Sequence, residues 1–427
     1  MFDLDRWQEI WQTITRNKLR SFMTAFGVFW GIFMLVIMLG SGKALKNGVY
    51  DGTDKFERNT CFMMAGTTSE PYAGFQRGRS WNLKESDLIA IENNVKGVKF
   101  TVPYVFARFS QSGNSNVSTN NVVNGLKAGT FDVQGITPNF YKVTQQTLLN
   151  GHFLNTMDLY QKRKVCVIGE KVKNVVFGQG ENPIGAYIRV NGIYVQVVGI
   201  VKSSSKMNIG GSPEESVYIP YSTAKQVFNI GETVHFMAIV GKQNADITQI
   251  EKDAKDLLRV RNKISPTDEQ AILSINVKQQ FQQMNAMFLG INILIWIVGL
   301  GTLLAGVIGV SNIMLITIRE RTKEIGIRRA IGATPKTIIS QIITESTVLT
   351  LVAGMGGLVL GVWGLQLVSS ILSAQPQDGQ IFFKNPGIDF TVAIIAVLIM
   401  VMFGALAGII PAKRAINIKP IDAIREE

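Results

Sequence analysis

The chain has 427 residues, of which 46% are hydrophobic, with a mean hydropathy of +0.19, a formal net charge of +12 and a pI near 9.6. This balance is too apolar for an ordinary soluble protein and too polar for a membrane bundle alone, so spans and a sizeable soluble part are expected together. The positive charge does not indicate nucleic acid, because no basic stretch is interleaved with aromatic residues and membrane proteins also gather Lys and Arg in cytoplasmic loops.

The first 45 residues predict a membrane anchor. In residues 1–20, Leu4, Trp7, Trp11 and Ile14 recur at three- and four-residue steps, which predicts an interfacial helix on the cytoplasmic leaflet. Residues 21–45 hold the first predicted span. Its apolar stretch is longer than that of a usual signal peptide, so an uncleaved anchor is favoured over a cleaved leader.

Residues 46–286 predict one large α+β domain between the first and second spans. A helix is predicted near residues 82–91, with Asn82 or Ser86 as its cap, and another over residues 247–260. Predicted strands cover residues 165–168, 187–190 and 194–201, and loops cover residues 111–121 and 210–213. Asn191-Gly192 joins the last two strands as a hairpin turn.

The two cysteines and two histidines of this domain give no clear site. Cys166 lies in an apolar run typical of a buried strand, and spacing alone does not settle whether it pairs with Cys61. His152 and His235 have no Cys, His or acidic partner at metal-ligand spacing, so no metal site is expected.

The remaining spans are predicted over residues 287–318, 338–372 and 390–410, since about 20 apolar residues cross a bilayer. The second is too long for one crossing, and the Gln-rich, Pro-free segment before it, residues 277–284, favours a helical stalk over a strong tilt. No charge lies inside the apolar cores of these spans, and Asn292 and Asn312 are interpreted as interhelical hydrogen-bonding groups.

Small residues recur in the spans at four-residue steps, which predicts close helix packing. They are Gly27, Gly31, Gly301, Ala305, Gly309, Gly357, Gly361, Gly404 and Gly408.

Lys and Arg set the orientation. They concentrate before the first span, in residues 319–337 and in the tail 411–427, whereas the short loop 373–389 holds only Lys384. Both termini and residues 319–337 are therefore expected in the cytoplasm, with residues 46–286 and 373–389 outside.

Residues 319–337 carry the most informative motif. Charged residues leave the second span and continue into a short predicted helix that ends at Gly332, with Pro335 just beyond. Charge alone would support only a solvated positive-inside loop. The sequence contains no Walker phosphate loop, no Gly-x-Ser-x-Gly and no His-Glu-x-x-His, so no catalytic or nucleotide-binding site is predicted in this chain.

At this motif the chain resembles the permeases of MacB-type, FtsX-like ABC transporters. The segment from Glu320 to Arg328, followed by Gly332-Ala333, is similar to the one that follows their second span. Further similarities lie in residues 17–22 with Gly27, 150–153, 183–185, 197–200, 218–223, 411–415, 420–421 and 423. His152 departs from the Arg that is usual in the family's Gly-Arg-Phe turn.

The resemblance implies a permease subunit in a bacterial inner membrane, coupled to a separate ATPase that binds ATP and Mg²⁺. It implies a homo- or heterodimer of permeases, export of substrate from the periplasm, and possible contact with a periplasmic adaptor and an outer-membrane channel. The ATPase-coupling residues that it implies are Glu320, Arg321, Lys323, Glu324, Gly326, Arg328, Arg329, Gly332 and Ala333.

Two other readings stay open. One is a lipoprotein-releasing or lipid-handling relative, and the other is a signal relay that activates a periplasmic or cell-wall partner without transport. The size of the outer domain favours the exporter.

Overall fold

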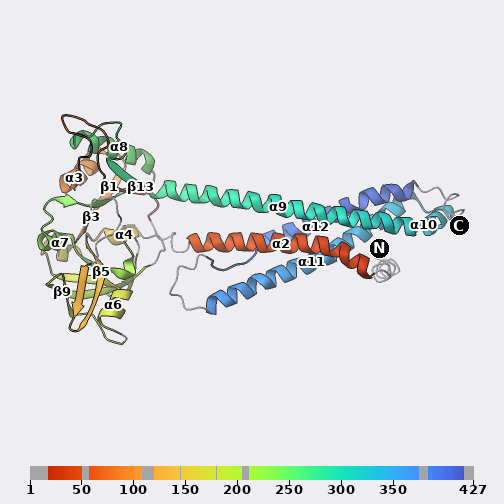
Figure 1. Cartoon of the computed structure of the whole chain (residues 1–427), viewed down its shortest axis with the longest axis horizontal. Coiled ribbons are helices and arrows are strands. Elements are labelled where there is room, and N and C mark those ends of the chain that lie inside the picture. The colour runs from red at the N-terminus through yellow and green to blue at the C-terminus, as the bar shows by residue number, and fades with distance from the viewer. Residues whose placement is uncertain are drawn as a thin grey trace. The chain divides into compact units, whose positions relative to one another are not determined.

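The structure is a computed structural model that describes residues 18–50, 57–107, 120–144, 146–178, 180–203, 211–374 and 383–417. The chain divides into two compact units, one formed by Met1–Val49 with Ala286–Glu427 and the other by Tyr50–Asn285 (Figure 1). The predicted interfacial helix and most of the predicted loop 111–121 lie outside the described residues.

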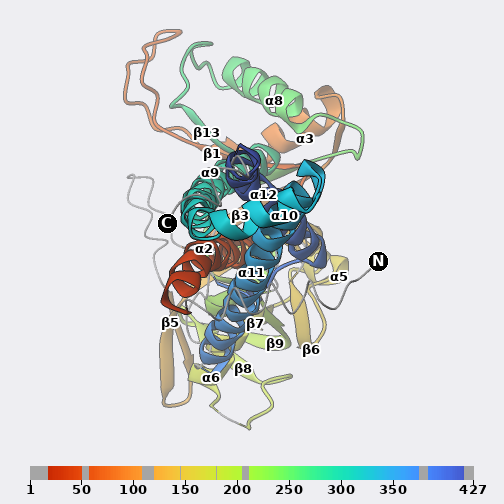
Figure 2. The same ribbon diagram turned by 90° about the vertical axis from the view of Figure 1, so that its right-hand side faces the viewer.

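The first unit is helical, as Figures 1 and 2 show. Its long helices are α2 (Lys18–Tyr50), α9 (Val277–Glu320), α11 (Pro335–Ala374) and α12 (Phe390–Ile416), and the short α10 (Thr322–Ala330) joins α9 to α11. Four helices are long and apolar enough to cross a membrane, which confirms the predicted number of spans. Helix α9 has 44 residues and is therefore about 66 Å long. It begins at Val277, so the Gln-rich segment is helical.

Glycines allow the long helices to approach one another closely. A Cβ on Gly357 would lie 2.5 Å from the Phe29 carbonyl oxygen, and one on Gly404 would lie 2.9 Å from the Thr347 Cα. Gly27, Gly31, Gly361 and Gly408 also lie against neighbouring helices. The Ser346 hydroxyl donates to the Gly404 carbonyl at 2.9 Å and so joins α11 to α12 within the spans.

One face of α9 has no partner helix among the described residues. A Cβ on Gly301 or Gly309 would meet nothing within 4 Å. Ala305 is exposed. Asn292 and Asn312 are exposed as well, and neither side-chain amide makes a hydrogen bond within the described part of the chain. The predicted interhelical role of these two amides is therefore not fulfilled inside one copy, because both point away from the neighbouring helices.

The second unit is an α+β domain built on one large sheet. Its strands are β1 (Thr60–Ala65), β3 (Val98–Phe106), β4 (Asn120–Asn124), β5 (Lys127–Ile136), β6 (Thr147–Gly151), β7 (Val165–Gly169), β8 (Tyr187–Val190), β9 (Ile193–Lys202), β10 (Ser216–Pro220), β12 (Phe236–Gly241) and β13 (Ile272–Asn276). A small second sheet pairs β2 (Leu83–Lys84) with β11 (Thr233–Val234). The helices are α3 (Glu85–Asn94), α4 (Phe140–Thr144), α5 (Thr156–Tyr160), α6 (Glu170–Val176), α7 (Tyr221–Phe228) and α8 (Ile247–Arg261), with a 3₁₀ turn at Pro213–Glu215.

Part of the large sheet closes into a barrel. The strand order is β10-β7-β9-β8-β4-β5, and β10 also pairs with β5 in parallel register from Ser216–Asp132 to Pro220–Ile136. The sheet then continues through β3 and β12 to β1 and ends at β13. The last strand runs directly into α9.

Alternating side chains of the sheet fill two cores, as expected from the period of two in a strand. On β1, Cys61 and Met63 belong to the core that α3 and α8 cover. Phe62 belongs to the opposite core, with the rings of Tyr104 and Phe236.

The structure confirms the hairpin and corrects several local predictions. Asn191 (φ 48°) and Gly192 (φ 91°) form the tight turn between β8 and β9. Neither Asn82 nor Ser86 caps α3, because the helix begins at Glu85 and the Asp87 carboxylate accepts the Lys84 N–H at 3.1 Å. Residues 120 and 121, predicted as loop, begin strand β4. Both cysteines are free and buried.

Candidate functional site at the connection between α9 and α11

Local backbone chemistry makes α10 a separate short helix. Arg321 interrupts the helical path (φ −100°, ψ 13°), although its N–H still bonds to the Thr317 carbonyl at 3.1 Å. At the other end, the N–H groups of Gly332 and Ala333 bond back to the carbonyls of Arg329 (3.2 Å) and Arg328 (3.0 Å). This is the Schellman pattern, which needs a left-handed residue, and Gly332 supplies it with φ +107°.

A cap and a proline then start α11. The Thr337 N–H lies 3.4 Å from the Thr334 hydroxyl, and Pro335 occupies the first helical position, where its missing N–H costs no intrahelical bond. The connection from α9 to α11 is therefore a defined turn-helix-turn.

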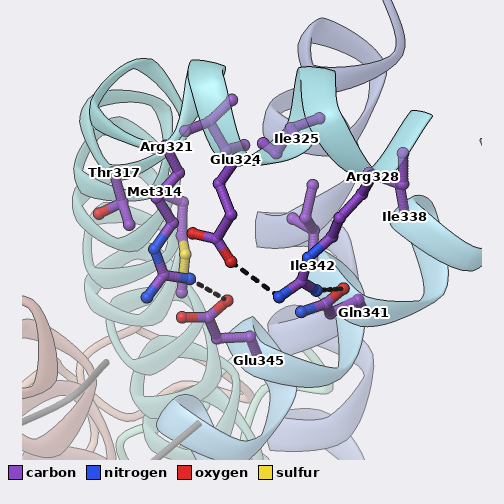
Figure 3. Close-up of a pocket in the computed structure, with 11 residues that line it drawn as sticks. Met314, Thr317, Arg321, Glu324, Ile325, Arg328, Ile338, Gln341, Ile342 and Glu345 are labelled. Carbon is purple, nitrogen blue, oxygen red and sulfur yellow. Dashed lines mark hydrogen bonds and ion pairs between the residues drawn. The ribbon is translucent and has the colours of Figure 1, made fainter. Parts of the chain in front are cut away.

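The inner face of α10 closes a small pocket of about 40 Å³ against α9 and α11 (Figure 3). Its walls combine apolar side chains with two guanidinium groups and two carboxylates. The lining residues are Met314, Thr317, Ile318, Arg321, Glu324, Ile325, Arg328, Ile338, Gln341, Ile342 and Glu345.

The charged groups of this pocket are paired with one another, within α10 and from α10 to α11, as the dashed lines in Figure 3 mark. Arg321 Nη1 lies 3.6 Å from Glu345 Oε2, and Arg328 Nη2 lies 2.7 Å from Glu324 Oε1. Arg328 Nη1 also donates to Gln341 Oε1 at 3.2 Å. Glu345 is only 7% exposed. The two arginines therefore connect the α9–α10 junction and α10 to successive turns of α11.

A third arginine reaches α12. Arg329 Nη1 donates to the carbonyl of Ile416, the last residue of α12. A helix end leaves its last carbonyls without intrahelical partners, so a guanidinium is a favourable neighbour there. Three of the predicted coupling residues, Arg321, Arg328 and Arg329, thus contact this chain's own helices.

The outer face of α10 has a different character. Ile327 is 46% exposed and Ile331 is 82% exposed, and they lie one turn apart. Lys323 and Ala330, on the same side, are exposed too. Glu320 and Gly332 are exposed at the two ends of the segment, whereas Gly326 is buried against the bundle. The predicted coupling set is therefore divided between an inner charged face and an outer face.

Two residues of the site were missed from the sequence. The apolar core of the third span holds no charge from Val348 onward, as expected, but α11 begins at Pro335 and buries Glu345 in the turns before that core. Gln341 and Glu345 are polar residues one turn apart in a mostly apolar helix, and this spacing was the available signal.

The fold and the site define a class: a membrane permease with four spans, a large α+β domain inserted after the first span, and a short helix between the second and third. Residues 21–257 match the MacB-like periplasmic core domain, and residues 283–420 match the FtsX-like permease C-terminal domain. The chain belongs to the MacB-like and FtsX-like family of ABC transporter permeases.

Curated relatives agree with this assignment. The chain is 30% identical over 309 residues to the pyoverdine export ATP-binding/permease protein PvdT of Pseudomonas entomophila, covering 71% of this chain and 44% of that protein. It is 26% identical over 398 residues to the macrolide export ATP-binding/permease protein MacB of Bdellovibrio bacteriovorus, covering 92% of this chain and 57% of that protein. The chain thus spans about half the length of these relatives.

A solved structure resembles the outer domain. The periplasmic region of MacB from Actinobacillus actinomycetemcomitans is 20% identical, with a TM-score of 0.43, and the match covers 56% of this chain and 97% of that one.

Proposed function

We propose that this chain is the permease subunit of an ABC exporter, coupled to an ATPase on a separate chain. The observation that carries the proposal is the outer face of α10, where Ile327 and Ile331 expose an apolar stripe beside Lys323. Exposed isoleucines on a capped helix do not stabilise a loop that stays in water. On a helix that docks onto a partner, the same side chains are the apolar anchors that the partner buries. The relatives named above are ATP-binding/permease proteins, which makes an ATPase the expected occupant.

In this proposal ATP and Mg²⁺ bind to the partner subunit. The connection from α9 to α11 lies in the cytoplasm and the outer domain in the periplasm of a bacterial inner membrane, as the distribution of Lys and Arg favours. Closure of the ATPase moves α10, and the motion passes along the spans.

Helix α9 is the proposed path to the outer domain. It is one uninterrupted helix whose residues up to Asn285 belong to the outer unit. Its first turn is fastened there, because the Gln279 N–H donates to Asn276 Oδ1 at 3.1 Å and Asn276 Nδ2 donates to Glu251 Oε2 of α8 at 2.9 Å. Lys278 also pairs with Asp246 at 3.0 Å. Movement of α9 would therefore be carried into β13 and α8.

The proposed result is a rearrangement of the outer domain that expels substrate from the periplasm, with an adaptor and an outer-membrane channel as further partners.

A permease dimer is part of the proposal. Gly290, Leu294, Ile297, Gly301, Ala305, Ile308 and Asn312 recur at three- and four-residue steps on α9 and are all exposed. An exposed stripe that holds Gly290, Gly301 and Ala305 suits close packing of a second copy, in which the amide of Asn312 could find a partner.

The docking face can be tested by placing a charge on it. Ile331→Asp in the full chain should reduce the amount of ATPase that copurifies from the native membrane by about tenfold or more, because an apolar anchor in an interface is often worth about 2 kcal/mol. Leu126→Asp is the matched control, since Leu126 is a fully exposed residue of the outer domain. Undiminished copurification and undiminished transport-linked ATPase activity in the Ile331 variant would refute docking through this face.

A further inference from the structure

Gln341 and Glu345 stand out as polar side chains on the pocket side of α11 (Figure 3). They lie four residues apart and so occupy successive turns of one helix face. Each receives a different arginine, with Gln341 accepting from Arg328 at 3.2 Å and Glu345 pairing with Arg321 at 3.6 Å. No feature of a simple membrane anchor requires this arrangement.

We propose that Gln341 and Glu345 are positioning residues that latch the coupling helix α10 onto the third span. In this arrangement α10 and the first turns of α11 move as one body. The inference rests on the proposed function for its purpose, because a latch matters when a partner pushes on α10, but the latch itself is a property of this chain.

The buried position of Glu345 requires a compensating partner. A carboxylate that is 7% exposed is costly unless a cation or several donors compensate it. Arg321 supplies the cation from the point where α9 gives way to α10. The pair therefore fixes the position of the helix break relative to α11.

Helix α10 is attached to α11 at two points. Arg328 lies in the last turn of α10, about two turns beyond Arg321, and it bridges Glu324 of its own helix to Gln341. Attachment at both ends of a short helix fixes its direction, whereas one contact would leave it free to swing. Ile325, Ile338 and Ile342 fill the space between the two attachments.

Arg329 extends the same body to α12. Arg329 donates to the Ile416 carbonyl, and Ala412 and Ala415 of α12 pack in the same apolar cluster as Ile338. The geometry therefore joins α10 to both C-terminal helices of the bundle.

The latch can be tested by the accessibility of an introduced cysteine, measured with no nucleotide added. Ile325→Cys places a thiol on the partly buried side of α10, and the native Cys61 and Cys166 are buried. In inside-out membrane vesicles, a soluble maleimide should label this introduced thiol slowly when the rest of the chain is native. Glu345→Gln combined with Gln341→Ala should raise that rate about tenfold, the change that roughly 1.4 kcal/mol produces.

Two further variants separate a latch from general loosening of the fold. The exchange of Arg321→Glu with Glu345→Arg should restore slow labelling, since it rebuilds the pair with opposite polarity. Ser340→Ala, at an exposed neighbour of Gln341, should leave the rate unchanged. An unchanged labelling rate in the Gln341/Glu345 double variant would overturn the proposal. Fast labelling of the charge-exchanged chain, at a normal level of that chain in the membrane, would overturn it too.

Copurification of the ATPase, measured on the same variants, keeps this inference apart from the proposed function. Retained ATPase with fast labelling of the introduced thiol in the double variant supports the latch and the docking face together. If no ATPase copurifies with the unaltered chain, the proposed function is refuted, and the labelling result still tests the latch.

Discussion

Two ionisable side chains of the outer domain titrate in unusual ranges for opposite reasons. Burial, with a smaller effect of Glu215, raises the pKa of Asp132 to about 6. Burial lowers the pKa of His235 to about 4, and its Nδ1 accepts the Phe106 N–H at 3.0 Å. Between about pH 4 and 6 the folded domain holds more protons than the unfolded chain at Asp132, and fewer at His235.

These signs predict the pH dependence of unfolding. The contribution of Asp132 is present at low pH and is lost as the pH rises through about 6, whereas the contribution of His235 is lost as the pH falls from about 6.5 towards 4. Asp132→Asn should therefore make the stability of the outer domain rise more steeply from pH 4.5 to 7, by about 1 kcal/mol, since the side chain is only half-buried.

Urea unfolding of residues 50–285 at the two pH values measures this change. His235→Gln is the matching variant. Removing the histidine should make the slope of the free energy of unfolding against pH less positive. Identical slopes for Asp132→Asn and the unaltered domain would show that the carboxyl titrates normally.

At the scale of elements, the glycines of the spans differ in what surrounds them, although their spacing in the sequence is alike. A Cβ on Gly357 would meet the backbone of α2 at 2.5 Å, whereas one on Gly301 would meet nothing within 4 Å. Overpacking of a close contact typically costs about 1–3 kcal/mol, and an open helical glycine gains up to about 1 kcal/mol as alanine.

Gly357→Ala should accordingly lower the temperature at which the detergent-solubilised chain unfolds, and Gly301→Ala should leave it unchanged or raise it. The thermal unfolding of both variants in the same detergent measures this difference. If α9 packs against a second copy, Gly301→Leu should also shift the chain from dimer to monomer in light scattering. Equal destabilisation by the two alanines would contradict the helix packing described above.

At the scale of the whole molecule, the expected orientation depends on Lys and Arg alone. The Lys336→Cys variant should be protected from an impermeant thiol reagent in intact cells, and the Leu126→Cys variant should be labelled. Both positions are exposed, so protection would report the side of the membrane. Labelling of the Lys336 variant together with protection of the Leu126 variant would invert the topology and place α10 away from any cytoplasmic ATPase.

Much of this organisation could be read from local sequence. Runs of apolar residues determine the four spans, and Asn191-Gly192 determines a hairpin, because each depends on neighbours in the chain. Gly332 and Pro335 similarly delimit the helix between the second and third spans. These features follow from backbone geometry and hydrophobic length, which a few consecutive residues fix.

Other features were decided only by tertiary structure. The barrel closes through the pairing of Ser216 with Asp132, on two strands far apart in the sequence. In the sequence, the arginines of the coupling segment indicate a solvated or docking surface. The folded structure places Glu345 and Gln341 opposite two of them. Local sequence is enough to place the helices along the chain. The faces at which the helices meet become clear only in the folded molecule, because each contact depends on the packing of both partners at once.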